Sequence, residues 1–290
     1  MLARAGKAAQ ASPLSAVAEL VRRHDRDRYM TALFAPGDRR EALMALYAFN
    51  HEVAKTRESV SEPMLGRIRL QWWREGLEAA YGGGMVRQHE VMLPLAAAIR
   101  QFALTRGEFE ALIDAREQDL DPDPPSTVAA LEAYCADSAG RLQVLALEAL
   151  GVRDAAAAVA AREVGIAYAL TGLLRAAAFH ARARRQYIPV ELAAEVGLDA
   201  GALFELRPTP PLALAAKRLA GRAREHLAAA RAGAAGIPTA ALPALLPARL
   251  AGAYLRAIER AGYDVLDPGL ALPRGGNGLR LAWAALIRRY

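Results

Sequence analysis

Four arginines fall in a stretch of the chain that has no acidic residue to balance them. They are Arg175, Arg182, Arg184 and Arg185, between residues 164 and 190. Guanidinium groups bind phosphate and carboxylate oxygens through paired hydrogen bonds, so such a cluster can form an anion pocket. Arginine stems also cover apolar surface while their heads stay in water. The pattern therefore leaves two interpretations open, an anion site and a solvated basic face.

A second candidate segment covers residues 39–58, where apolar residues recur at helical spacing. Leu43, Leu46, Tyr47 and Asn50 share one face of the predicted helix, which by itself indicates a stripe that faces the core. Five acidic residues between residues 114 and 123 form another group that could be read as a metal cluster. A helix end and several prolines scatter these side chains, so we interpret them as the end of a helix followed by a solvated loop.

Three segments resemble the squalene/phytoene synthase family. Two are YAFN at residues 47–50 and LLRAAAFHARARRQYIP at residues 173–189. The third, ESVSEPMLGRIRLQWWR at residues 58–74, resembles a divergent branch of the family that includes a mitochondrial assembly factor of respiratory complex I. The resemblance implies an all-α, isoprenoid-synthase-like (terpenoid synthase) helical bundle around a central cavity. Family positions that this chain matches imply a remnant substrate or anion pocket made of Arg40, Tyr47, Arg175, Arg185 and Tyr187.

The resemblance also indicates which features of the family this chain lacks. Active members of the family hold Mg²⁺ on two aspartate-rich motifs, in which carboxylates four residues apart share a helix face. Those acidic positions fall here on Ala54, Lys55, Glu58, Ala176, Phe179 and His180. One carboxylate beside an ammonium group binds a divalent cation poorly, so we expect no metal site and no catalytic residue. Mg²⁺ is expected only if the chain is nonetheless an active enzyme.

Composition predicts a helical chain with a large core. Hydrophobic residues make up 54% of the 290 residues, good helix formers dominate, and alternating β-branched segments are nearly absent. We expect a flexible tail at residues 1–12 and one domain at 13–290. Thr105 and Glu108 have the spacing of a capping box. The predicted helices cover about residues 13–24, 39–60, 64–81, 90–104, 107–120, 128–150, 155–183, 212–232, 242–261 and 279–289.

Charge and the remaining motifs narrow the functional classes. The formal net charge is +6, which suits an anionic partner or reflects a general preference for arginine. No basic helix with interleaved aromatic residues appears, so we expect no nucleic-acid partner. The histidine spacings match no zinc motif.

Three functions stay open at this point. The branch resemblance implies a non-catalytic protein that acts in assembly of respiratory complex I, with its subunits or assembly proteins as partners. The old cavity could bind a prenyl or quinone-type lipid. The alternative is an active prenyltransferase that condenses prenyl diphosphates in isoprenoid biosynthesis. We expect a cytoplasmic location with peripheral contact at the inner membrane face, or the matrix side of a mitochondrion.

Overall fold

The computed structural model describes residues 14–272 and 275–290, and in this part of the chain every regular element is helical. The predicted tail at residues 1–12 lies outside the described residues. The α-helices are α1 (Ala16–His24), α2 (Arg26–Ala32), α3 (Gly37–Ala54), α4 (Pro63–Gly82), α5 (Met92–Phe102), α6 (Arg106–Glu117), α7 (Val128–Cys135), α8 (Arg141–Ala149), α9 (Ala155–Arg175), α10 (Ala177–Arg182), α11 (Val190–Val196), α12 (Ala200–Phe204), α13 (Pro210–Ala232), α14 (Leu242–Leu245), α15 (Pro247–Arg260) and α16 (Asn277–Leu286). Shorter helical turns are η1 (Arg57–Ser59), η2 (Gln118–Leu120), η3 (Ala136–Gly140, a π-helical turn), η4 (Ala234–Gly236), η5 (Thr239–Ala241) and η6 (Pro268–Leu270).

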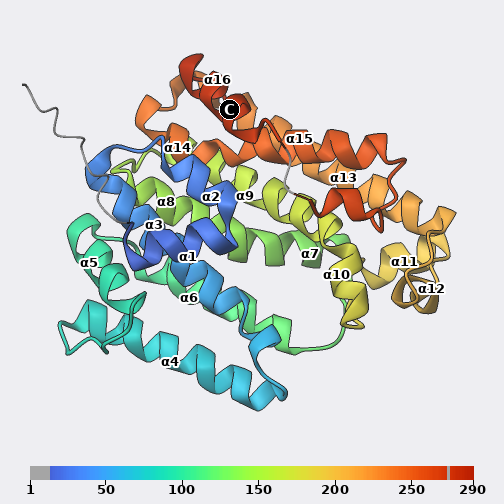
Figure 1. Ribbon diagram of the computed structural model, residues 1–290, viewed down its shortest axis with the longest axis horizontal. Helices are drawn as coiled ribbons and strands as arrows, with labels where there is room; N and C mark the ends of the chain where they lie inside the picture. The colour runs from blue at the N-terminus through green and yellow to red at the C-terminus, as the bar shows by residue number, and fades with distance from the viewer. Residues whose placement is uncertain (1–13, 273–274) are drawn as a thin grey trace, which may run out of the picture.

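Helix α9 lies near the centre of the bundle, with α13 and α15 above it and α6 and α4 below it in the view of Figure 1. It packs against α13, α15, α8 and η3. By length and composition α9 could cross a membrane, but 56% of its most apolar window is buried inside the protein. Its apolar character is therefore accounted for by its place in the core, where it meets neighbours on several sides.

Local sequence signals explain where several helices begin and end. The backbone N–H of Ala157 donates to Asp154 Oδ1 at 2.8 Å, and this satisfies one of the free amides in the first turn of α9. Thr209 accepts from the amide of Leu212 at the start of α13, whose first residue is Pro210. Gly83 ends α4 at φ +71°, a conformation that costs residues with a Cβ more than it costs glycine.

The structure corrects several predicted boundaries. The helix expected at 128–150 is interrupted by η3, where the Ser138 hydroxyl donates to the carbonyl oxygen of Tyr134 at 2.6 Å. Such a bond to the preceding turn competes with regular helix geometry. The helix expected at 155–183 breaks after Arg175. Helices α2, α11 and α12, which are seven residues or shorter, were not predicted.

The capping box predicted at Thr105 and Glu108 is wrong. The Thr105 hydroxyl donates to Glu148 Oε1 at 2.5 Å and its amide donates to Glu148 Oε2 at 2.7 Å. Glu108 instead contacts Arg141 at 3.3 Å. A buried carboxylate from α8 therefore replaces the local cap, because a desolvated charge requires hydrogen-bond donors wherever they are available.

Close backbone packing between α9 and η3 predicts a strong response at Gly165. A Cβ there would lie 2.6 Å from both the Ala139 carbonyl oxygen and the Gly140 Cα. Because backbone atoms cannot rotate away, we expect Gly165→Ala to lower the free energy of unfolding by about 1–3 kcal/mol. Gly172→Ala is the matched control on the same helix, where a Cβ meets nothing within 4 Å. Urea denaturation that finds both variants equally stable would contradict this packing.

Candidate functional site

The first degenerate motif follows a buried carboxylate that is already neutralised. Ala54 ends α3, Lys55 follows it, and Glu58 lies exposed on η1. The nearby Glu52 is 5% exposed and forms ion pairs with Lys55 and, at 2.9 Å, with Arg69. Each oxygen of this carboxylate therefore already has a cationic partner.

The positions of the second degenerate motif lie where α9 gives way to α10. Ala176 joins the two helices, and Phe179 on α10 is 52% exposed. His180 stacks edge-on against Tyr187 with their ring centroids 4.8 Å apart. Burial, and then the charge of Arg185, lower the pKa of His180 to about 4. The imidazole is therefore neutral near pH 7 and contributes no positive charge to an anion site.

A buried carboxylate organises the residues next to His180. Asp119, on η2, accepts hydrogen bonds from Tyr134 at 3.0 Å and from Tyr187 at 2.9 Å. Arg116 and Arg185 each lie 3.3 Å from one of its oxygens, and Arg185 also donates to the Asp119 backbone carbonyl. We call these five residues the Asp119 cluster.

Both tyrosines of the Asp119 cluster act as hydrogen-bond donors. Burial, followed by the charge of Asp119, raises the pKa of Tyr187, and burial raises that of Tyr134. The phenols therefore stay protonated, and each gives its proton to the carboxylate. Arg116 in turn donates to the Tyr134 oxygen at 2.6 Å. The carboxylate is satisfied by the other members of the cluster, whereas the Arg116 Nε is buried without a hydrogen-bond partner among the described residues.

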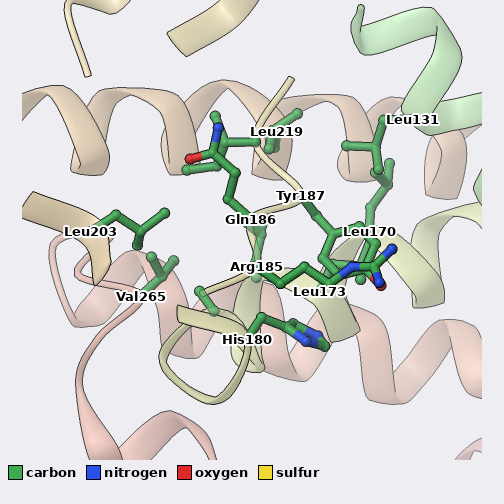
Figure 2. Close-up of a pocket in the computed structure, with 13 residues that line it drawn as sticks. Leu131, Leu170, Leu173, His180, Arg185, Gln186, Tyr187, Leu203, Leu219 and Val265 are labelled. Atoms are coloured by element: carbon green, nitrogen blue, oxygen red, sulfur yellow. The ribbon is translucent and has the colours of Figure 1, made fainter. Parts of the chain in front are cut away.

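The pocket beside the Asp119 cluster is small and apolar. Its lining comes from α7, α9, α10, α12, α13 and the segment after α10, and Figure 2 shows Arg185 and Tyr187 extending to the same side of it. The free volume is about 30 Å³. That is room for one or two water molecules, since a single water needs about 10–15 Å³ by this measure. A prenyl chain does not fit into this space as it stands.

Arg175 lies in a different pocket, of about 610 Å³, between α2, α9 and the region of α16. Its guanidinium stacks on the Tyr254 ring at 3.6 Å, and its Nε donates to the Leu270 carbonyl oxygen at 3.0 Å. Asp27 accepts hydrogen bonds here from Tyr254 at 2.6 Å and from Tyr168 at 3.2 Å. The pocket thus carries charges of both signs, and Arg175 already has an aromatic and a carbonyl partner.

The structure places the residues of the predicted anion pocket in separate sites. Arg185 and Tyr187 meet in the small pocket, which lies against Leu170 and Leu174 of α9. Arg175 belongs to the larger one with Tyr168, seven residues earlier and therefore on the same side of α9. Residues two positions away along a helix point in nearly opposite directions, so α9 separates the two sites.

The other two predicted pocket residues lie elsewhere in the fold. Arg40 donates to the carbonyl oxygens of Leu33 and Ala35, at 3.1 and 3.2 Å, and so holds the turn between α2 and α3. Tyr47 is fully buried, and burial raises its pKa to about 12. Neither residue lines the two pockets described above.

Sequence reasoning missed the burial of Asp119 in the candidate site. We expected it at the solvated end of the helix over residues 107–120, but it is 6% exposed. The available signal was its register: Arg116 and Asp119 continue the spacing of Phe109 and Leu112, which are buried on α6. A charged pair on a core-facing stripe indicates a buried polar cluster. Within residues 14–272 and 275–290, no three His, Cys, Asp or Glu side chains are placed to hold a metal ion.

Removal of the charge on Asp119 should strongly destabilise the fold. Asp119→Asn leaves Arg116 and Arg185, both about 15% exposed, without a counterion. We expect the free energy of unfolding to fall by about 3–5 kcal/mol, as for other broken buried ion pairs. Asp114→Asn is the control, because Asp114 is 67% exposed in its ion pair with Arg74, and about 1 kcal/mol or less is expected there. Similar losses in both variants would argue against the cluster.

The depressed pKa of His180 predicts a pH dependence of stability. The unfolded chain protonates this residue near pH 6.5, whereas the folded chain does so at about 4. The unfolded state therefore gains protons first, and stability falls as the pH is lowered through this window, by about 3 kcal/mol at most. We expect His180→Gln to flatten the fall in unfolding free energy between these pH values. A variant whose pH profile overlays that of the wild type would contradict the assignment.

Comparisons with known proteins agree with this architecture. The family model for squalene/phytoene synthase matches residues 21–276. NADH dehydrogenase (ubiquinone) complex I, assembly factor 6 from Mus musculus is 31% identical over 252 residues, covering 87% of this chain and 75% of that protein. Presqualene diphosphate synthase from Rhodopseudomonas palustris is 30% identical over 204 residues, covering 70% of this chain and 72% of that protein.

Solved structures show the same fold. A dehydrosqualene synthase in complex with ligand superimposes with a TM-score of 0.81 at 20% identity, covering 93% of this chain and 94% of that one. A squalene synthase from Alicyclobacillus acidocaldarius gives a TM-score of 0.75 at 22% identity, covering 85% and 93%. The expected all-α, isoprenoid-synthase-like bundle is confirmed. With its helical fold and the match over residues 21–276, the chain belongs to the squalene/phytoene synthase family.

Proposed function

We propose that this protein is a non-catalytic member of its family that acts in the assembly of respiratory complex I. The observation that carries the proposal is the chemistry at the two degenerate motifs. Five of their six acidic positions hold Ala54, Lys55, Ala176, Phe179 and His180. The remaining one, Glu58, is exposed on η1, away from the buried carboxylate of Glu52.

Loss of these carboxylates removes the means of activating a prenyl diphosphate. Departure of diphosphate places several negative charges on the leaving group, and divalent cations held by carboxylates neutralise them. Arginines could take over part of this role only if their guanidinium groups faced the substrate. Arg185 faces Asp119 and Arg175 faces Tyr254, so both are already engaged.

The size of the small pocket weighs against a prenyl-lipid carrier. A free volume of about 30 Å³ beside His180 and Arg185 requires α10 or the following segment to move before a long apolar chain could enter. Such a movement would break the hydrogen bonds of Arg185 and Tyr187 to Asp119. Lipid binding is therefore the second candidate, and it predicts that a ligand displaces the Asp119 cluster.

Relatives of two kinds match at nearly equal identity, 31% for the assembly factor and 30% for the presqualene diphosphate synthase. Identity alone does not discriminate between them, whereas coverage of this chain, 87% against 70%, and the altered motifs both favour the assembly role. We place this role at the cytoplasmic face of a bacterial inner membrane, or at the matrix face in a mitochondrion, with complex I subunits or assembly proteins as partners.

Deletion of the gene should lower the amount of assembled complex I in the host. We expect wild-type chain and Glu58→Ala to restore assembly equally, because the only carboxylate left at a motif position is exposed and holds no metal in this proposal. The measurement is NADH dehydrogenase activity on native gels of membrane extracts, together with the squalene content of the same cells.

Purified protein provides the counterpart experiment. Farnesyl and geranylgeranyl diphosphates are supplied with Mg²⁺ or Mn²⁺, with the presqualene diphosphate synthase of R. palustris as the positive control. We expect no diphosphate release from this chain. Metal-dependent release, or loss of squalene with normal complex I in the deleted strain, would replace the proposal by the prenyltransferase alternative.

A further inference from the structure

Helix α16 exposes a continuous apolar stripe. Leu279, Trp283 and Leu286 are 79%, 62% and 74% exposed. Their spacing of four and then three residues places them on one face of the helix. The opposite face buries Leu281 and Ala284 against Leu246, Leu250 and Tyr254. Single exposed apolar residues are ordinary, but three large ones in one stripe indicate a surface that meets another apolar phase.

Arginines line a cavity just beyond the C-terminal end of α16. A cavity of about 600 Å³ is lined by Arg231 of α13, Arg249 of α15, and Arg288 and Arg289 after α16. Two of them donate to main-chain oxygens: Arg231 to that of Tyr290 at 3.2 Å and Arg249 to that of Arg289 at 3.3 Å. Across the part of the chain that the structure describes, none of the four is within ion-pair distance of a carboxylate side chain.

The positive charge here is dense enough to lower the pKa of one of these arginines. Burial, followed by the charges of Arg231, Arg256 and Arg289, lowers the pKa of Arg249. The sequence from residue 268 to 290 contains no Asp or Glu. The site therefore holds four arginines without a side-chain counterion among the described residues, and two of them follow α16 directly in the chain. Guanidinium groups favour phosphate oxygens.

Helix α4 also exposes an apolar stripe, and the charges around it distinguish it from the stripe of α16. Met64, Leu65 and Ile68 of α4 are 58%, 47% and 60% exposed. The arginines beside them are compensated, since Arg67 and Arg74 both pair with Glu117. Helix α4 lies at the bottom of the view in Figure 1, and α16 lies at the top. Only the α16 surface of these two joins an apolar stripe to net positive charge.

We propose that α16 docks on an anionic phospholipid bilayer, with Leu279, Trp283 and Leu286 in the interfacial layer and lipid phosphates among the four arginines. Helices of this kind lie in the plane of the membrane, with the apolar face inserted and the cations at the headgroups. A tryptophan at the boundary suits its partly apolar, partly polar ring. A nucleic acid would use the arginines but leave Leu279 and Leu286 without a partner. The inference stands independently of the assembly role.

Flotation of the full chain with vesicles tests the proposal. We expect binding to vesicles of phosphatidylcholine mixed with phosphatidylglycerol, little binding to phosphatidylcholine alone, and weaker binding as salt is raised. Trp283→Ser should weaken binding about tenfold or more through lost apolar burial. The double variant Arg288→Gln with Arg289→Gln should weaken it by about tenfold or more. Ile68→Ser on α4 is the matched control and should bind as the wild type does.

Tryptophan fluorescence adds a direct readout. The emission of the wild type should shift to the blue on anionic vesicles, and Trp283→Phe should show no such shift, because Trp72 and Trp73 lie on α4. Circular dichroism melting curves are the folding control, and every variant should melt as the wild type does. If Trp283→Ser does not fold, Leu279→Ser takes its place.

Four outcomes would overturn the proposal. The first is equal binding to neutral and anionic vesicles. The second is release of the vesicles by inorganic phosphate when sodium chloride of the same ionic strength leaves them bound, which would indicate a free-anion site. The third is a dimer in solution that Trp283→Ser dissociates, which would assign the stripe to a second copy. The fourth is tighter binding of RNA than of vesicles, lost in the double arginine variant. Failure here would leave the complex I proposal untouched, since that test measures assembled enzyme in cells.

Discussion

The pairing of the Asp119 carboxylate with two arginines and two tyrosines is the interaction on which the candidate site depends. A charge removed from water is tolerated only when donors surround it, and each member of such a cluster becomes costly if its partners leave. Arg116 and Asp119 follow one another along α6 and η2, Tyr134 comes from α7, and Arg185 and Tyr187 come from the segment after α10. One carboxylate thus joins three parts of the chain.

This pairing has a direct consequence for chemistry. An arginine stabilises the charge of a leaving group only if its guanidinium faces the ligand, and Arg185 faces a protein carboxylate. The segment that carries it packs over the small pocket, where about 30 Å³ remains free. The fold is that of squalene and dehydrosqualene synthases. A shared fold does not fix the function, which depends on the residues that the fold presents.

Helix α9 is the central helix of the bundle, and α13, α15, α8 and η3 pack against it. Small residues along it allow very close approach, as at Gly165, where the η3 backbone takes the place of a side chain. Its different sides face the two pockets, with Arg175 and Tyr168 lining one and Leu170 and Leu174 lining the other. Arg175 and Arg185 belong to one sequence motif and are only ten positions apart, yet they lie in different pockets.

The sequence by itself determined the helical class, because strand-like alternation is absent and breaks such as that at residues 82–84 separate amphipathic segments. It also determined the loss of the acidic motifs, since Ala54 and Ala176 cannot hold a metal wherever they lie. Only the tertiary structure decided that Asp119 is buried, that the Thr105 hydroxyl contacts Glu148, and that the predicted anion pocket is divided. Each of these outcomes depends on partners that are distant in the sequence. Arg185 and Asp119, for example, are 66 residues apart. Burial and pairing of charges are properties of the packed chain, so local spacing does not encode them.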